Sequence, residues 1–139
     1  MITTAIITSL LIAIVFLFTL VFQFGVCSSK KSKENFLPIS VVIAAKDEEE
    51  NIKSCLASII KQDYPNFEII LVDDHSSDKT IAFSRTFQGE FPNLNIIKAK
   101  NHGKKSAIQQ GIQKAQNEYL LFTDADCQPR SANWISKMI

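Results

Sequence analysis

The sequence predicts an α/β domain built on a parallel sheet and preceded by one transmembrane helix. Over residues 39–139, short apolar runs rich in β-branched residues alternate with polar stretches of helical length. This alternation is typical of parallel strands joined by right-handed helical crossovers. Residues 1–29 carry no charged side chain, and an apolar helix needs roughly 20 residues to cross the hydrocarbon layer. We therefore predict a transmembrane helix over 1–29, a basic and polar linker over 30–38 and a domain over 39–139.

Charge predicts the orientation of the N-terminal segment. Lys30, Lys31 and Lys33 follow the apolar stretch, and no positively charged side chain precedes it. Positive flanks stay in the cytoplasm, so the soluble part is expected on the cytoplasmic side of the cell membrane. A cleaved signal peptide is disfavoured, because the stretch is too long and lacks a basic start and a small-x-small cleavage site. A lipoprotein cleavage box is also disfavoured, because it needs a small residue before its cysteine and Val26 precedes Cys27.

Composition excludes several classes of protein. The formal net charge is only +1, so no strong field favours nucleic acid as a partner. The cysteines Cys27, Cys55 and Cys127 are scattered, and neither His75 nor His102 lies at zinc-finger spacing from them. A disulfide framework or zinc site is therefore not expected. We expect reduced thiols and two ordinary solvent-exposed loop histidines; Cys127 is interpreted as a small filler, with a nucleophile role left open.

The first half of the domain reads as strand, helix, strand. Residues 39–45 form a continuous apolar run that predicts a buried strand. Residues 49–62 predict a helix, because apolar side chains recur on one face at 3.6-residue spacing; these are Ile52, Leu56, Ile59 and Ile60. Carboxylates at residues 47–49 suit the helix start, and residues 63–66 break the helix. Residues 67–72 predict the second strand.

The second half repeats the pattern. A helix over 79–87, for which Ser76 or Ser77 can supply the cap, is followed by a short strand over 94–98. After a turn at 101–103, residues 104–116 predict a third helix, whose expected inward side chains are Ala107, Ile108, Gly111, Ile112 and Ala115. Residues 119–123 predict the fourth strand, and residues 134–139 can begin another helix.

Acidic residues follow three of the four predicted strands. They are found in Lys46-Asp47-Glu48-Glu49, in Asp73-Asp74-His75 and in Asp124-Ala125-Asp126. Parallel sheets bind ligands beyond the carboxyl ends of their strands, and neighbouring carboxylates suit a cation or a ligand rich in hydrogen-bond donors. Because positions i and i+2 of extended backbone point to the same side, Asp124 and Asp126 can serve a ligand and a metal together. A solvated turn with Asp124 as a helix cap remains the alternative.

Gly103-Lys104-Lys105 precedes the third predicted helix. Glycine permits a tight turn there, and a lysine at a helix N-terminus can meet a phosphate. The segment lacks the full Walker pattern, so it is not a P-loop. A solvated lysine pair is the competing interpretation.

The domain resembles the family 2 glycosyltransferases, which have the GT-A fold. Four segments match the family's motifs in order: 41–65 the opening strand and helix, 67–80 the Val-Asp-Asp-x-Ser-x-Asp-x-Thr signature, 101–115 the Asn-x-Gly-Lys segment, and 119–129 the Asp-x-Asp strand. The resemblance implies a Rossmann-like nucleotide-diphospho-sugar transferase fold, incomplete over this length. It also implies inverting transfer of a sugar from a UDP- or GDP-activated donor to a hydroxyl of a lipid, polysaccharide or other glycan.

The resemblance implies a role for each matching residue. Ala44, Lys46 and Glu48 would line the base and ribose pocket, and Asp74 would accept a hydrogen bond from the base. Three further residues would contact the rest of the donor: Lys104 near the base or phosphates, Asp124 at the ribose or sugar, and Asp126 as ligand of Mn²⁺ or Mg²⁺ on the diphosphate.

The sequence departs from the family pattern at three places. Lys46 stands where Tyr or Arg is common, and Asp47 where Asn is common, which leaves the base of the donor open. The family's catalytic base, in a Glu-Asp pair, is expected beyond Ile139. A non-catalytic, membrane-tethered nucleotide-sugar-binding module is therefore the alternative function. A receiver domain and an Asp-x-Asp phosphatase are disfavoured, because their acidic motifs follow other strands.

Overall fold

The computed structural model describes residues 14–16, 18–19 and 36–139. The chain divides into two compact units, residues 1–35 and residues 36–139. In the first unit the described residues are helical, and the Thr19 hydroxyl donates to the carbonyl of Phe16. No helix among the described residues has both the length and the apolar character needed to span a membrane. Most of the predicted transmembrane helix and most of the predicted linker lie outside the described residues.

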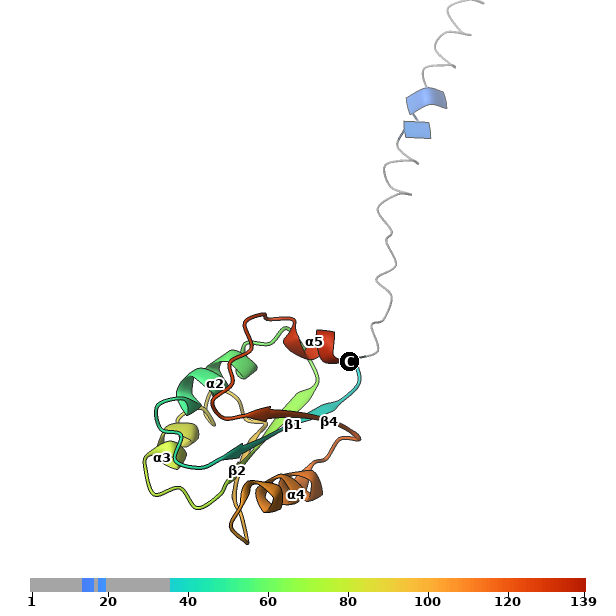
Figure 1. Ribbon diagram of the computed structural model, residues 1–139. Coiled ribbons are helices and arrows are strands. Elements are labelled where there is room, and N and C mark those ends of the chain that lie inside the picture. Colours follow the sequence, from blue (N-terminus) through green and yellow to red (C-terminus); the bar gives the residue numbers. More distant parts are fainter. Residues whose placement is uncertain (1–13, 17, 20–35) are drawn as a thin grey trace, which may run out of the picture. The chain divides into compact units, whose positions relative to one another are not determined.

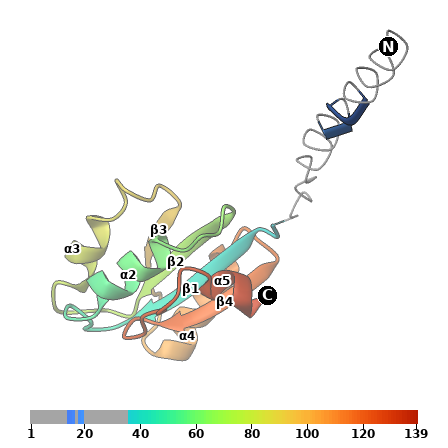
Figure 2. The ribbon, with the colours of Figure 1, turned by 90° about the horizontal axis from the view of Figure 1, so that it is seen from above.

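The second unit is built on a four-stranded parallel sheet, as predicted (Figure 1). Its strands are β1 (Ile39–Ala45), β2 (Phe67–Asp73), β3 (Leu94–Lys98) and β4 (Tyr119–Asp124). They lie in the order β3-β2-β1-β4, so β4 is an edge strand. The helices are α2 (Ile52–Ile60), α3 (Thr80–Arg85), α4 (Lys104–Lys114) and α5 (Trp134–Met138). Figures 1 and 2 show α2, α3 and α5 on one face of the sheet and α4 on the other.

The two faces of the sheet bury unequal sets of side chains. Alternate residues of β1 and β2 pack with α2 in the larger cluster, which includes Ile43, Leu71 and Ile59. The smaller cluster lies under α4 and includes Val72 and Ala107. Because successive strand residues point to opposite faces, the continuous apolar runs supply both layers.

A glycine sets the close approach of α4 to the sheet. A Cβ atom at Gly111 would overlap the side chain of Val42, which is fully buried in β1. Ala107, one helical turn earlier, is also fully buried. The prediction that Ile112 faces inward is wrong, since 42% of this residue is exposed. The small residues form the contact face of α4, and Ile112 falls beside it.

The helices begin and end inside the predicted limits. The predicted helix 49–62 starts at Ile52, because residues 48–51 form a turn in which the amides of Asn51 and Ile52 donate to the carbonyl of Glu48 at 3.1 and 2.9 Å. The acidic residues before it therefore lie outside the first turn. The predicted helix 104–116 ends at Lys114, because Ala115 adopts extended backbone with ψ 133°.

The predicted cap of α3 is wrong. Ser76 and Ser77 bond to Asp47 rather than to the helix. The Asp78 carboxylate instead accepts from the backbone amide of Thr80 at 2.9 Å, and also from its hydroxyl. This local side-chain bond is the one that Asp residues commonly form at helix starts.

Candidate functional site

A cavity of about 160 Å³ opens at the carboxyl ends of β1, β2 and β4. Strand register brings these ends together, since Ala44 pairs with Val72 on one side and with Asp124 on the other. The lining includes all the residues assigned to the site from sequence: Ala44, Lys46, Glu48, Asp74, Lys104, Asp124 and Asp126. Ala45 and Ala125 complete it. The structure thus brings together residues that are up to 82 positions apart, from 44 to 126.

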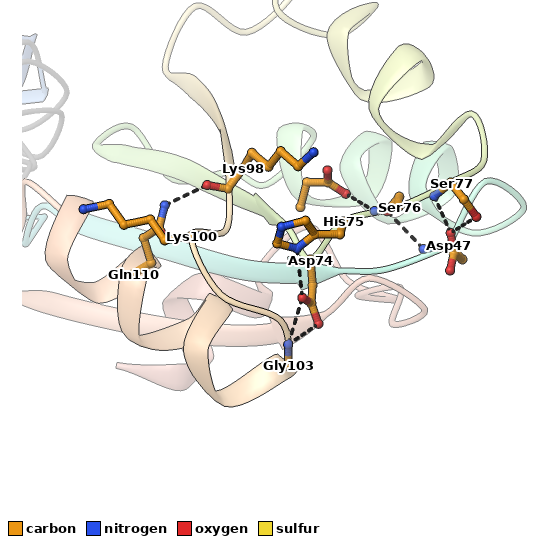
Figure 3. A network of polar contacts seen from close by, with 10 residues as sticks. Asp47, Asp74, His75, Ser76, Ser77, Lys98, Lys100, Gly103 and Gln110 are labelled. Atoms are coloured by element: carbon orange, nitrogen blue, oxygen red, sulfur yellow. Dashed lines mark hydrogen bonds and ion pairs between the residues drawn. The ribbon is translucent and has the colours of Figure 1, made fainter.

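Asp74 is held at the cavity by backbone amides. Both of its carboxylate oxygens accept from the Gly103 amide at 2.9 Å (Figure 3), and its own amide donates to Ala45 at 2.8 Å. Gly103 has a φ of 105°, which favours glycine. Burial raises the pKa of Asp74, but the Gly103 amide, His75 and the charges of Lys46 and His102 more than offset it, so the net pKa is lowered. Asp74 is therefore an anchored anion.

The loop after β1 is fastened to the loop after β2. Asp47 Oδ1 accepts from the Ser77 amide at 2.7 Å, while the Asp47 amide donates to the Ser76 hydroxyl at 3.1 Å (Figure 3). Glu49 and Asp78 exchange similar bonds, because the Glu49 amide donates to Asp78 Oδ2 at 3.0 Å and the Lys79 amide donates to the Glu49 carboxylate at 3.0 Å. Burial raises the pKa of Asp78, but hydrogen bonds from the hydroxyl and amide of Thr80 and from the Glu49 amide outweigh it and hold the pKa below its usual value.

These bonds divide the acidic residues into two groups. Asp47, Glu49 and Asp78 join the two loops, whereas Glu48 and Asp74 line the cavity. Sequence reasoning did not assign the joining role. The Asp and Ser residues in short spacing after β2 are the available signal, because such residues commonly bond to nearby backbone amides.

The two aspartates of the Asp-x-Asp segment have different surroundings. Lys104 Nζ lies 2.7 Å from Asp124 Oδ1, and both side chains are at least half exposed. The bond to Asp124 is the main cause that raises the pKa of Lys104, with a further contribution from the charge of Asp126. The Asp126 side chain forms no hydrogen bond or ion pair within the part of the chain that the structure describes.

This difference bears on cation binding. Hard divalent cations take carboxylate oxygens, and Mg²⁺ typically keeps waters and needs only one or two protein carboxylates. Asp126 offers such an oxygen without breaking an internal bond, whereas Asp124 is engaged by Lys104. The residues therefore fit one hard cation held by Asp126.

A buried alanine and a buried thiol hold the Asp-x-Asp segment against the hydrophobic core. Ala125 and Cys55 belong to the larger core cluster, and Cys55 Sγ donates to the Asp124 carbonyl at 3.7 Å. Burial, with smaller effects from Cys127, Asp126 and Glu48, raises the pKa of Cys55 to about 12. Cys127 is exposed, so its interpretation as a small filler is wrong.

The expectation of two ordinary, solvent-exposed loop histidines holds for His102, which is exposed, whereas the side chain of His75 is only 24% exposed. The rings of His75 and His102 stack with their centroids 3.8 Å apart and their planes 26° apart. His75 has a positive φ of 61°, in the left-handed region where histidine is enriched several-fold over most residues. Nothing in the sequence links these two positions.

The family model of "Glycosyl transferase family 2" matches residues 40–139. The chain belongs to this glycosyl transferase family. Glycosyltransferase AglE of Haloferax volcanii is 34% identical over 102 residues, covering 71% of this chain and 33% of the relative. The poly-beta-1,6-N-acetyl-D-glucosamine synthase of Staphylococcus epidermidis is 35% identical over 92 residues, covering 63% of this chain and 21% of the relative. The chain thus spans a third or less of these relatives.

Two solved structures share the fold of this chain. The mannosyltransferase PcManGT of Pyrobaculum calidifontis, in complex with GDP-Man and Mn²⁺, aligns with a TM-score of 0.68 and 26% identity, over 73% of this chain and 31% of that one. S. aureus TarS 1-349 in complex with UDP-GlcNAc aligns with a TM-score of 0.65 and 26% identity, over 73% and 30%. The described domain therefore has the GT-A-like parallel-sheet fold expected from the sequence.

Proposed function

We propose that residues 39–139 form the donor-binding part of a metal-dependent, inverting glycosyltransferase that uses a UDP- or GDP-activated sugar. The observation that carries this proposal is the cavity at the sheet edge, which gathers the residues expected to contact the donor. Family membership supports the reaction class. The complexes of TarS with UDP-GlcNAc and of PcManGT with GDP-Man and Mn²⁺ support the class of donor.

The base would lie between the ends of β1 and β2. Asp74 is ionised and anchored by Gly103, and each carboxylate oxygen keeps a second lone pair for another donor. Uracil and guanine both carry a ring N–H that can donate to such an oxygen. Lys46 and Glu48 would bracket the base and ribose, and Ala44 leaves room for a flat ring beside the strand.

The diphosphate would lie toward the start of α4 and the end of β4. Lys104 would contact the donor there, exchanging part of its bond to Asp124 for one to a phosphate. A Mn²⁺ or Mg²⁺ ion on Asp126 would neutralise the diphosphate as a leaving group. Asp124 would then accept hydrogen bonds from the ribose or the sugar.

A neighbouring hollow offers room for the transferred sugar and its acceptor. Ligand pockets usually measure at least about 300 Å³, so the 160 Å³ cavity would hold only part of a nucleotide sugar. A second hollow of about 660 Å³ shares Asp124 with the cavity. It is lined by residues of β4 and of the segment after it, among them Phe122, Arg130 and Trp134. We propose that the acceptor, a lipid, polysaccharide or other glycan, approaches from this side.

The alternative is a binding module without turnover. Inverting transfer needs a carboxylate to take the acceptor proton, and we propose that this base lies outside residues 1–139. The test is to incubate the protein, in a form that includes the segment proposed to carry the base, with Mn²⁺ and panels of UDP- and GDP-sugars, following sugar transfer and donor hydrolysis by mass spectrometry. Turnover supports the enzyme, and metal-dependent binding without turnover supports the module. Absence of donor binding contradicts both.

We also propose that residues 1–29 anchor the protein in the cell membrane with the domain in the cytoplasm. The support is the uncharged N-terminal stretch and the lysines that follow it. Cys127 is exposed and Cys55 is buried, so a membrane-impermeant thiol reagent reports on the side that the domain occupies. We expect membrane-bound protein whose Cys127 is labelled only after cells are opened, with a Cys127→Ser variant as control. Labelling in intact cells would contradict this topology.

A further inference from the structure

Asp74, His75 and His102 form a cluster of metal-ligating side chains at the rim of the proposed donor cavity. A carboxylate oxygen of Asp74 and one ring nitrogen from each histidine all lie within 4.8 Å of one another. His75 Nδ1 lies 3.5 Å from Asp74 Oδ1. That nitrogen is buried, and it has no hydrogen-bond partner in the part of the chain that the structure describes. Figure 3 shows the His75 ring beside the Asp74 carboxylate.

We propose that Asp74, His75 and His102 bind a divalent transition-metal ion of the zinc class, at a site separate from the cation on Asp126. Imidazole nitrogens suit zinc and its neighbours, whereas Mg²⁺ and Mn²⁺ prefer oxygen ligands. Two imidazoles and one carboxylate make a three-residue set that leaves a fourth position for water, as in open zinc sites.

The geometry is close to that of such a site. Bonds of about 2.0–2.1 Å in a tetrahedron place neighbouring ligand atoms roughly 3.3 Å apart. The pair from Asp74 and His75 already lies at 3.5 Å. His102 is exposed in the bend that precedes α4, so rotation of its ring can close the remaining distance without disturbing the core.

Neighbouring residues hold two of the ligands in place. The Gly103 amide bonds both oxygens of Asp74 at 2.9 Å, which is the kind of outer bond that orients metal-binding carboxylates. The left-handed backbone of His75 places its ring between Asp74 and the ring of His102.

Zinc bound at this site would affect donor binding, a consequence that rests on the proposed function. Asp74 also lines the cavity assigned to the nucleotide base. The ring N–H of the base needs a free lone pair and the negative charge of this carboxylate. A zinc ion bound there would occupy a lone pair and offset the charge. Zinc would therefore compete with the donor, whereas Mn²⁺ on Asp126 would promote donor binding.

The first experiment titrates Zn²⁺, and Co²⁺ as its coloured substitute, into the chain of residues 1–139 in detergent, without a histidine tag. These residues contain only two histidines, so any imidazole signal in X-ray absorption or nitrogen NMR comes from His75 or His102. We expect one equivalent bound with imidazole ligation, and a loss of affinity of about tenfold or more in His102→Ala and in His75→Asn. Asparagine tolerates a positive φ, so His75→Asn keeps the local backbone.

Asp126→Asn is the matched control, and it should leave zinc affinity unchanged. Zinc affinity that survives both histidine substitutions, or that disappears in Asp126→Asn, would overturn the proposed site. Circular dichroism of each variant ensures that a loss of affinity does not reflect unfolding.

The second experiment measures UDP and GDP binding in Mn²⁺ with and without saturating Zn²⁺. We expect zinc to weaken the affinity about tenfold or more in the wild-type chain and not in the double variant His75→Asn/His102→Ala. Donor affinity that zinc leaves unchanged overturns the competition. Absence of donor binding together with intact zinc binding overturns the proposed function and leaves the zinc site standing.

Discussion

The two ends of the parallel sheet both carry carboxylates, but a buried one at the amino end and an exposed one at the carboxyl end have different surroundings. At the amino end, Glu68 is only 7% exposed, and its oxygens accept from the Ser40 hydroxyl at 2.6 Å and the Gln116 amide at 2.8 Å. Two asparagine side chains add longer bonds. At the carboxyl end, Asp126 lines a cavity and has no such partner among the described residues.

The comparison separates carboxylates that stabilise the fold from those available to a ligand. Buried polar groups are normally satisfied by hydrogen bonds within the protein. Glu68 follows this rule and joins the start of β2 to the segment before β4. The rule does not constrain Asp126, because this residue is exposed and its carboxylate can exchange solvent for a ligand. Substitutions at the two ends should therefore change different measurements.

The largest expected effect is the loss of stability in Glu68→Ala. Removing the carboxylate leaves the buried Ser40 hydroxyl and the part-buried backbone amide of Gln116 without their acceptor, and a buried unsatisfied group costs about 1–3 kcal/mol. We expect the free energy of unfolding to fall by about 3 kcal/mol, measured by urea denaturation with Trp134 fluorescence. Glu68→Gln retains one acceptor oxygen and should lose less. Equal stability of Glu68→Ala and wild type would break the comparison.

Asp126→Asn should have the opposite profile. Its stability should match that of the wild type, because the side chain forms no internal hydrogen bond or ion pair in the described region. Mn²⁺-dependent affinity for UDP or GDP should fall about tenfold or more, which corresponds to about 1.4 kcal/mol. Calorimetry measures the affinity, and thermal denaturation measures the stability. A destabilised variant that binds the donor normally would reverse the assignment.

Cys55 tests whether a buried group at the carboxyl end stabilises the fold without serving a ligand. The pKa of Cys55 is about 12 in the folded chain, against 9.0 for an unperturbed cysteine thiol. Between these values the unfolded chain releases the proton first, so stability is unaffected below pH 9 and falls as pH rises above it. The loss should be about 1.4 kcal/mol at pH 10.

The measurement compares the pH dependence of unfolding in wild type and Cys55→Ala. The variant's absolute stability will differ because packing changes, so only the difference in slope above pH 9 is diagnostic. Identical slopes would show that the Cys55 thiol is not protected from ionisation in the folded state.

The smallest effect overall is expected for Lys104→Ala. Its ion pair with Asp124 is exposed on both sides, and such surface pairs contribute little to stability. We expect an unchanged melting temperature but a several-fold weaker donor affinity, because a phosphate contact is lost. Lys105→Ala, at the next position, is the control and should change neither. Weakened binding in both variants would indicate only a general charge effect.

Much of the fold could be predicted because it depends on local patterns. Runs of β-branched residues mark β1 and β2, whose every residue is buried or nearly so. Helix limits were less predictable, because they depend on contacts between loops. The start of α2 at Ile52 follows from bonds between residues 47–49 and 76–80, and the sequence gives no measure of such pairing.

The site was predictable to the extent that strand ends define it. Asp74 and Asp126 could be placed together because parallel strands end at one edge. The joining role of Asp47 and the stacking of His75 on His102 depend on the paths of two loops. No periodicity in the sequence encodes those paths, so these features appear only in the structure.

The most direct test of the central claim is a calorimetric titration of UDP and GDP into the full-length chain in detergent, in Mn²⁺ and in chelator. We predict that one of the two nucleotides binds with Mn²⁺, that chelator weakens this binding, and that Asp126→Asn abolishes the metal dependence while Glu68→Gln retains it. Absence of binding by a folded wild-type chain, or metal-dependent binding that Asp126→Asn leaves intact, would contradict the account.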